Sequence, residues 1–354
     1  MGQIKINNLD IQAGANSICS NIIFSIPKNT VATIAGDLES GRHELVDAIL
    51  GYIRPTNGTI LIDSEEIQTL PVNKRKFVCI NQDWSLFPHL NVRQHIEFGL
   101  AFHKLEKGEA QQRVDRILQV LGLAEKQNLL PTHMNYLEQF KTVIGRAAAI
   151  EPNLVVMREP FMSFDGHKKR QLAGLFRELQ SEFKFSALIS TDNPLDTMGI
   201  SEQLIIMSKG YIEQVGPTRE VYDYPSSMLV AQMTGEINVL QGQVVMGGDF
   251  YMFTTKVGGI NLKCKEKLRI ETQVDILIRP EHSKLVPLGK TADARNVFSA
   301  KIRRIDFMGG FEFVELATED NTTFLSVQNA EQGFQVGDDI DVILTRDDYT
   351  IRKR

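Results

Sequence analysis

The chain has 354 residues, of which 42% are hydrophobic and 23% are charged, a composition typical of folded globular proteins. Its net charge of −5 gives no support to a nucleic-acid-binding or anionic-membrane-binding function for the whole chain. No apolar run approaches the roughly 20 residues that a membrane-spanning helix needs, and the first residues lack the features of a secretion signal. Three widely separated cysteines fit a reducing compartment without a disulfide framework. These features predict a cytoplasmic, multidomain protein without a membrane span of its own.

The first 62 residues predict short strands joined by turns. The apolar run at 31–35 is typical of a strand buried on both faces, and it leads through a glycine-rich turn at 36–41 into a helical pattern at 44–50. A strand, a glycine-rich turn and a helix in this order are the context of a phosphate-binding loop.

The hydrophobic spacing becomes helical between about 91 and 151. Short apolar strands then return at 154–157, 187–190 and 204–207, with an amphipathic helix at 166–183 between the first two. This alternation predicts an α/β domain.

The pattern changes again near residue 235. Helical stripes end there, and short alternating segments such as 274–278, 311–316 and 340–344 follow, separated by Gly, Asn and Asp. We therefore expect an α/β domain over 1–235 and a small all-β barrel or sandwich over 236–354.

The glycines of the turn have the spacing of the phosphate-binding loop pattern G-x-x-x-x-G-K-[ST], at Gly36 and Gly41. The pattern continues with lysine and then serine or threonine, whereas Arg42 and His43 follow here. The strict pattern is not met, and the spacing alone favours a structural strand-to-helix turn.

Five further segments occur in the order found in one protein family. They correspond to its glutamine loop, the helix after its signature motif, its Walker B strand, the segment after its switch loop, and an Arg-Pro-Glu in its appended β domain. In this chain the segments are 80–92, 145–153, 154–160, 209–217 and 279–281. Over essentially its whole length the chain resembles ATP-binding-cassette (ABC) subunits of the maltose, molybdate, iron and polyamine importer type.

The resemblance implies a P-loop NTPase-like α/β core with an inserted helical subdomain at about 88–150, followed by an all-β, OB-like (TOBE-type) regulatory domain. It implies ATP and Mg²⁺ as cofactors, transmembrane permease subunits as partners, and a homo- or heterodimer at the inner face of the cell membrane, without a role for nucleic acid. It also implies which residues meet those partners. Permease contacts fall on Gln82, Trp84 and Phe87, and dimer contacts on Asn135, Tyr136 and Asp165.

The nucleotide-binding positions are partly retained. Gly36, Ser40, Gly41 and Gln82 match the family, and Glu159 stands at the position of the general base that orients the attacking water. Other positions depart from the family. Arg42 replaces the loop lysine, His43 the Mg²⁺-binding hydroxyl, Arg158 the Walker B aspartate, Thr191 the switch histidine, and Met134-Asn135-Tyr136-Leu137-Glu138 the signature LSGGQ.

These replacements change the chemistry of the site. A planar guanidinium does not reproduce a compact ammonium in a tight cradle, and His43 offers nitrogen where Mg²⁺ prefers oxygen. Asp37 and Glu39 add negative charge where a triphosphate would lie. We expect Arg158 to fill the vacated metal pocket as an ion pair with Asp37, Glu39 or Glu44.

Three hypotheses follow. The first is an importer subunit with little or no ATP hydrolysis that acts as a structural or regulatory component; Glu159 would then be an inactive base. The second is an active ATPase in which Arg42 and Arg158 together neutralise the γ-phosphate. The third makes the β domain a solute sensor, for which Arg279, Glu281 and His282 are the candidates. No metal site is expected, since the histidines show no ligand spacing; His89, His95 and His103 are expected to be solvated or to cap helices.

Overall fold

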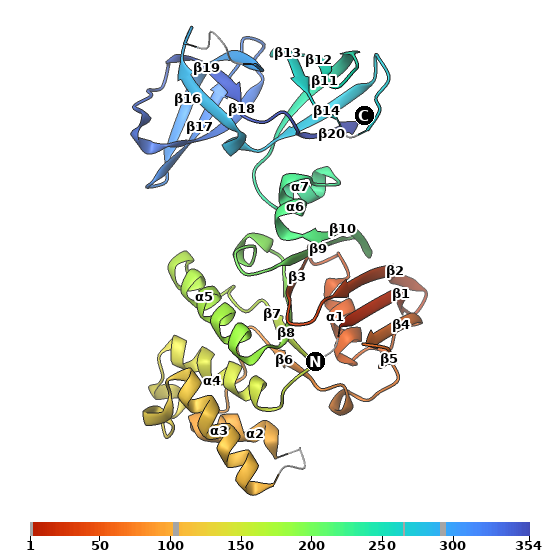
Figure 1. The fold of residues 1–354 in the computed structure, drawn as a ribbon, viewed down its shortest axis with the longest axis vertical. Coiled ribbons are helices and arrows are strands. Elements are labelled where there is room, and N and C mark those ends of the chain that lie inside the picture. The colour runs from red at the N-terminus through yellow and green to blue at the C-terminus, as the bar shows by residue number, and fades with distance from the viewer. Residues whose placement is uncertain (1–2, 102–105, 265, 291–294) are drawn as a thin grey trace. The chain divides into compact units, whose positions relative to one another are not determined.

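A computed structural model describes residues 3–101, 106–264, 266–290 and 295–354. The chain divides into two compact units, 1–221 and 222–354 (Figure 1). The division lies before the expected boundary at 235/236. The reason is Arg279, whose buried guanidinium donates hydrogen bonds to the main-chain oxygens of Tyr222, Ala231 and Glu236 and so ties 222–236 to the β domain.

Two sheets form the core of the first unit. The larger has the order β10-β9-β3-β8-β7-β6, and its strands are parallel except for β10. The smaller is antiparallel, with the order β2-β1-β4-β5. The bounds of the larger sheet are β3 (Val31–Ala35), β6 (Phe77–Ile80), β7 (Leu154–Arg158), β8 (Ser186–Thr191), β9 (Gln203–Ser208) and β10 (Tyr211–Pro217). Those of the smaller are β1 (Ile4–Ala13), β2 (Asn16–Ile26), β4 (Asn57–Ile62) and β5 (Glu65–Glu66).

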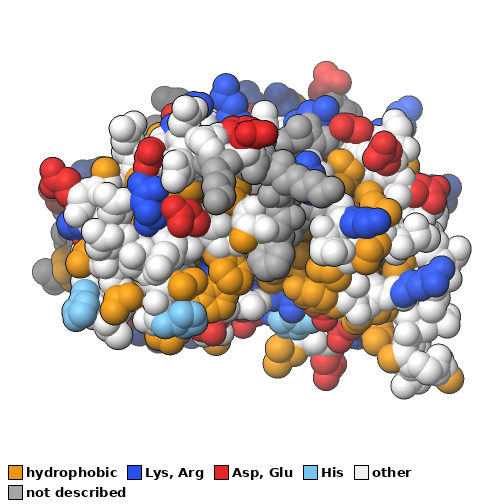
Figure 2. All heavy atoms as spheres, turned by 90° about the horizontal axis from the view of Figure 1, so that it is seen from below, with side chains coloured by type: hydrophobic (Ala, Val, Ile, Leu, Met, Phe, Trp, Pro, Cys, Tyr) orange, Lys and Arg blue, Asp and Glu red, His pale blue; other side chains and the backbone are white. Residues whose placement is uncertain are grey.

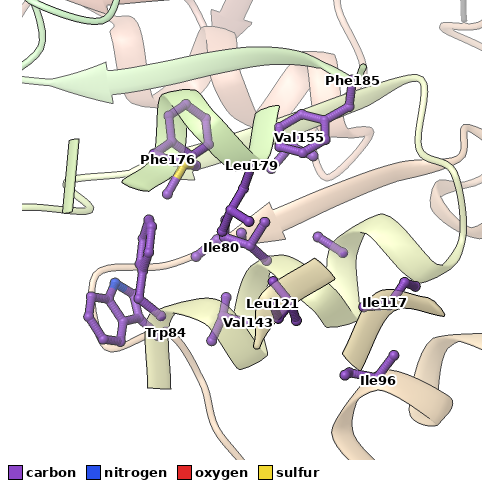
Figure 3. Packing of buried hydrophobic residues seen from close by; sticks show 14 of the residues in the cluster. Ile80, Trp84, Ile96, Ile117, Leu121, Val143, Val155, Phe176, Leu179 and Phe185 are labelled. Carbon is purple, nitrogen blue, oxygen red and sulfur yellow. The ribbon is translucent and has the colours of Figure 1, made fainter. Parts of the chain in front are cut away.

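Helices cover both faces of the larger sheet. Helix α1 (Arg42–Leu50) shares one apolar core with both sheets, and β3, whose side chains are all buried, runs directly into its loop. A second core joins the other face to α5 (Gly166–Phe183) and to the helical subdomain (Figure 3). That subdomain contains α2 (Val92–Leu100), α3 (Lys107–Leu121) and α4 (Tyr136–Ala149), within the range expected from the helical spacing.

The second unit holds two antiparallel five-stranded sheets around one core, and the short helix α7 (Met228–Met233) belongs to it. Helix α6 (Thr218–Asp223) crosses the division between the units. One sheet consists of β13 (Gly258–Leu262), β12 (Tyr251–Thr255), β11 (Asn238–Met246), β14 (Gln273–Ile278) and β20 (Thr350–Lys353). The other consists of β15 (Ser283–Pro287), β19 (Asp339–Leu344), β16 (Val297–Phe307), β17 (Phe311–Ala317) and β18 (Thr323–Asn329).

The surface at the end formed by α2 and α3 mixes acidic and basic side chains, and hydrophobic side chains gather toward its lower edge in Figure 2. A surface of mixed sign offers no continuous positive field to a polyanion. Within the described residues, no helix combines the length and the apolar character that a membrane crossing requires.

Candidate functional site

The loop with the phosphate-loop glycine spacing lies at the carboxyl edge of the larger sheet. The strands β3, β8 and β7 are neighbours and run parallel, so the segments that follow them meet at one edge. The loop at 36–41 follows β3, Glu159 follows β7, and Thr191 ends β8. The structure thus brings the predicted loop, base and switch positions together.

Arg42 points into the protein at this edge. Its side chain is 2% exposed, and all three of its guanidinium nitrogens have partners. Nε donates to the Gly36 carbonyl at 2.8 Å, Nη1 donates to Ser190 Oγ at 2.9 Å, and Nη2 lies 2.7 Å from Glu159 Oε1. A buried charge is stable only when paired and hydrogen-bonded, and Arg42 meets both conditions inside its own chain.

The loop also satisfies its own polar groups. Asp37 Oδ1 accepts a hydrogen bond from the Glu39 amide at 3.0 Å, so a carboxylate of the chain already engages a loop N–H. The buried Ser40 hydroxyl donates to the Asp37 carbonyl at 2.6 Å. Gly36 is required here, because a Cβ at this position would lie 2.5 Å from Ser40 Oγ.

Gly41 and Cys19 fix the other end of the loop. Gly41 has φ 81°, a conformation that favours glycine, and its carbonyl accepts a hydrogen bond from the Cys19 thiol at 3.3 Å. Burial, together with the charge of Glu44, raises the pKa of Cys19 to about 12. The thiol therefore stays protonated and acts as a packing group.

Arg158 stands at the position of the Walker B aspartate, which lies beside the metal in the family. Its acidic partner differs from those expected. It forms an ion pair with Asp47 of α1 rather than with Asp37, Glu39 or Glu44. Asp47 lies in the second turn of α1, where its side chain reaches Arg158 at the end of β7. The pair is partly buried, with 23% of the Arg158 side chain and 26% of the Asp47 side chain exposed.

The base and switch positions are likewise held by the chain itself. Besides the contact with Arg42, Glu159 Oε1 accepts a hydrogen bond from the Asp192 amide at 3.1 Å. The Thr191 hydroxyl accepts one from the Asn193 amide at 3.2 Å, and Thr191 is 4% exposed. Burial and the charge of Arg42 lower the pKa of His43, which therefore stays neutral near pH 7.

These contacts do not fit a magnesium–triphosphate group. Arg42, the cation of the loop, is already neutralised by Glu159. The metal side holds Arg158, a cation, in place of an oxygen ligand, whereas Mg²⁺ requires oxygen ligands. Within the described parts of the chain, no three His, Cys, Asp or Glu side chains are grouped so that they could hold a metal ion.

The three predicted permease-contact residues of the glutamine loop differ in how exposed they are. Gln82 is exposed and donates to Ser163 Oγ at 3.1 Å. Phe87 is half-buried, with its ring 4.7 Å from that of Phe98. Trp84 is only 4% exposed and lies in the buried cluster with Ile80 (Figure 3), so it supports the loop from within and is not itself a contact surface.

The signature position begins helix α4. Asn135 is its N-cap and accepts from the Glu138 amide at 3.0 Å, while Glu138 accepts from the Asn135 amide at 2.9 Å. This capping box satisfies donors that a helix N-terminus would otherwise offer to an anion. Tyr136 donates its hydroxyl hydrogen bond to Gln171 of α5. Asp165 is exposed and caps α5 through the Lys168 amide.

Two residues that the sequence analysis did not connect with the glutamine loop stabilise it. His95 is fully buried, and its Nε2 accepts a hydrogen bond from the Phe87 amide at 2.9 Å, so it caps the loop rather than being solvated. Arg146 of α4 donates to the Ser85 carbonyl at 2.8 Å and to the Trp84 carbonyl at 3.0 Å. His89 is exposed, as expected, and His103 lies outside the described residues.

In the second unit, the candidate sensor residues are engaged within the fold. Arg279 is 2% exposed, and its guanidinium lies 4.1 Å from the centre of the Tyr222 ring. Glu281 accepts the hydrogen bond of the Tyr222 hydroxyl at 2.5 Å. Burial lowers the pKa of His282, which is 8% exposed. These three residues thus fix the fold instead of lining an open site.

Comparison with known proteins agrees with this architecture. Residues 19–162 match the ABC transporter family, and residues 276–351 match the TOBE domain. The sulfate/thiosulfate import ATP-binding protein CysA of Synechocystis sp. is 28% identical over 333 residues, covering 94% of this chain and 90% of the relative. The Fe(3+) ions import ATP-binding protein FbpC 1 of Rhizobium meliloti is 27% identical, covering 92% of this chain and 90% of the relative.

A solved structure matches part of the fold. The structure of cbiO1 from Clostridium perfringens, described as part of the ABC transporter complex cbiONQ, aligns with a TM-score of 0.56 and 21% identity, covering 62% of this chain and 89% of that chain. The chain therefore has the mixed α/β fold of an ABC ATPase followed by a β-rich TOBE domain, which confirms the expected fold class. The relatives and the two domain matches support an ABC importer nucleotide-binding subunit.

Proposed function

We propose that this chain is a nucleotide-binding-subunit-like component of an ABC importer that hydrolyses little or no ATP. It serves a structural or regulatory role beneath the permease subunits, at the inner face of the cell membrane. Support for the importer assignment comes from relatives that are import ATP-binding proteins and match nearly the whole chain. Support for weak or absent hydrolysis comes from the contacts of the site.

The observation that carries the proposal is the buried ion pair between Arg42 and Glu159. Glu159 stands where the family has its general base, and a base acts only when its carboxylate is free to accept a proton from water. Here Glu159 Oε1 accepts hydrogen bonds from both Arg42 and the Asp192 amide, so this oxygen is not available to a water. The charges of Arg42 and Glu159 pair with each other, so neither is available to a nucleotide.

The second half of a composite site is also altered. In the family that the chain resembles, the loop of one subunit faces the signature motif of the other. Here Asn135 and Glu138 close the N-terminus of α4 with their own side chains. A homodimer would hold two altered sites, and a heterodimer with a competent subunit would still hold one altered half in each site. Turnover is expected to be low in both assemblies.

The glutamine loop is the proposed permease contact. Gln82 is exposed and Phe87 is half-buried beside the exposed Phe98, which gives a mixed polar and aromatic surface. Trp84 takes part only indirectly, because it is buried beneath this surface.

Isothermal titration calorimetry of the purified chain with Mg-ATP, together with an ATP turnover assay, tests the proposal. We expect no Mg-dependent turnover and no magnesium-dependent tightening of nucleotide binding. The matched variant combines Arg42→Lys, His43→Ser and Arg158→Asp, which returns the ammonium, the hydroxyl and the carboxylate of the family pattern. This variant is expected to gain Mg-dependent ATP binding.

A clear Mg-dependent rate in the unaltered chain, abolished by Glu159→Gln, would show that the chain is an active ATPase with unusual residues. Binding that is independent of metal and is lost in Arg42→Ala would point to the same enzyme hypothesis. The measured rate would end the proposal of a non-hydrolysing subunit, and the binding would end the claim that Arg42 is unavailable to a nucleotide.

A further inference from the structure

The glutamine loop has an unusual backbone that the surrounding residues hold in place. Trp84 has φ 57° and Ser85 has φ 45°, so two consecutive non-glycine residues lie in the left-handed region. Each such residue costs of order 1 kcal/mol and persists only where neighbouring contacts over-determine it. Those contacts are visible on both sides of the loop.

Four rings form a continuous aromatic cluster, which consists of Tyr136, Phe164, Trp84 and Phe140. The ring centres lie 5.9 Å apart between Tyr136 and Phe164, 5.2 Å between Phe164 and Trp84, and 5.1 Å between Trp84 and Phe140. These separations lie within the range of favourable aromatic pairs. The cluster joins the start of α4, the segment after β7 and the glutamine loop.

Arg146 provides a second attachment between α4 and the same loop. Its guanidinium donates to the Trp84 and Ser85 carbonyls and lies 5.4 Å from the centre of the Phe87 ring. Burial lowers the pKa of Arg146, and the charge of Asp83 opposes this shift. Charge-assisted hydrogen bonds from a planar fork fix two neighbouring carbonyls at once.

We propose that the aromatic cluster and Arg146 hold the glutamine loop against helix α4, so that contacts within the chain itself keep the loop in one conformation. Tyr136 is the residue of the cluster to test. It is the first residue of α4, at the signature position, and its ring lies at one end of the aromatic cluster. Its hydroxyl further anchors the ring to Gln171 of α5. That this loop contacts a permease rests on the proposed function, whereas the proposal that it is held against α4 does not.

Trp84 is the only tryptophan of the chain, so its fluorescence reports on the loop alone. Two variants test the cluster, Tyr136→Ala, which removes the ring, and Tyr136→Phe, which keeps it. Tyr211→Ala, at an exposed tyrosine of β10, is the matched control. We expect Tyr136→Ala to shift the Trp84 emission to longer wavelength and to increase its quenching by acrylamide. The phenylalanine variant and the control are expected to leave both unchanged.

A third variant, Arg146→Lys, tests the other attachment by hydrogen exchange at the amides of residues 84–87. A lysine keeps the charge but cannot hold both carbonyls, so these amides are expected to exchange about tenfold faster. Arg116→Lys on α3, at an exposed arginine of the same subdomain, is the control and should leave the rates unchanged. All measurements are made below the melting transition of each variant.

Unchanged emission and quenching in Tyr136→Ala would overturn the role of the cluster, and unchanged exchange in Arg146→Lys would overturn the role of the arginine. If Tyr136→Phe shows the same spectral shift as Tyr136→Ala, the effect comes from the hydroxyl contact with Gln171. That result would overturn the proposal that packing of the Tyr136 ring holds the loop. Neither measurement uses nucleotide or permease, so failure here leaves the ATP-binding test unaffected.

Discussion

Arg42 Nη2 lies 2.7 Å from Glu159 Oε1, and the Arg42 side chain is 2% exposed while that of Glu159 is 14% exposed. The two residues come from the helix after β3 and from the segment after β7, and they meet because these strands flank β8. A cation at the phosphate position and a carboxylate at the base position are thus paired with each other. This relationship makes Glu159 a structural residue in the proposed function.

Glu159→Gln is therefore expected to destabilise the fold. The substitution leaves the buried Arg42 guanidinium without its counter-charge, and breaking a buried pair in this way costs about 3–5 kcal/mol. Urea denaturation at neutral pH measures the loss. The control is Glu39→Gln, an exposed glutamate of the same loop, which is expected to change the free energy of unfolding by less than about 0.5 kcal/mol.

The opposite result would fit an enzyme. If Glu159→Gln kept full stability and instead abolished a measurable ATPase rate, the carboxylate would be a free base. The ion pair with Arg42 would then contribute nothing to the free energy of unfolding.

The pair between Arg158 and Asp47 is expected to contribute less, because about a quarter of each side chain is exposed. A double-mutant cycle with Arg158→Met and Asp47→Asn is expected to give a coupling energy of about 1 kcal/mol. The same cycle on Lys28 and Asp63, where more than half of each side chain is exposed, should give a coupling near zero. Equal couplings in the two cycles would contradict a supporting role for Arg158 in the vacated metal position.

Local sequence patterns predicted most of the fold. The buried run at 31–35, the helical stripes and the alternating segments after 235 depend on spacing along the chain, and they appear as β3, the helices and the two β sheets. The division between the two compact units falls at 221/222 rather than at the expected 235/236, because Arg279 reaches back to Tyr222 and Ala231. Spacing carries no information about such a long-range contact.

The resemblance named residues for the site but not their side-chain partners. The structure brings Arg42, Glu159 and Thr191 to one edge of the larger sheet. The partner of Arg158 was wrong, because several acids lie near the loop in sequence and only the three-dimensional packing selects Asp47. Trp84 was expected at the surface, but positive φ angles at Trp84 and Ser85 turn its ring inward, and no pattern in the sequence signals that turn.

The capping box of α4 is expected to make stability depend on pH. The ammonium of Lys126 and the amide of Asn135 hold the pKa of Glu138 below its usual range. A depressed pKa in the folded state contributes stability that is fully present above the unfolded value of about 4.3 and is lost as the pH falls through the folded pKa. Glu138→Gln should therefore destabilise the chain at pH 7, by about 1 kcal/mol.

Thermal or urea unfolding between pH 7 and pH 3 checks this prediction. The difference between Glu138→Gln and the unaltered chain should shrink as the pH falls below 4. Glu125→Gln, an exposed glutamate close in sequence to Lys126, is the control and should show a small difference that does not change with pH. A constant penalty for Glu138→Gln across this range would mean that the carboxylate charge is not what stabilises the helix start.

Arg279 is expected to be a structural anchor of the second unit. Its guanidinium donates to the carbonyls of Tyr222, Ala231 and Glu236 and to the Thr234 hydroxyl. Arg279→Met would leave these buried acceptors without donors, at a cost of about 3 kcal/mol or more. Differential scanning calorimetry of the full chain should show a lowered melting temperature, whereas Arg303→Met, at an exposed arginine of β16, should leave it nearly unchanged.

The same measurement separates an anchor from an anion sensor. A ligand that binds the folded state raises the melting temperature as its concentration exceeds its dissociation constant. The three guanidinium nitrogens of Arg279 already donate to groups of its own unit, so sulfate or molybdate is expected to leave the melting temperature of the unaltered chain unchanged. A specific rise with either oxyanion that Arg279→Met removes would show instead that this arginine exchanges its internal partners for a ligand. The β domain would then be a sensor.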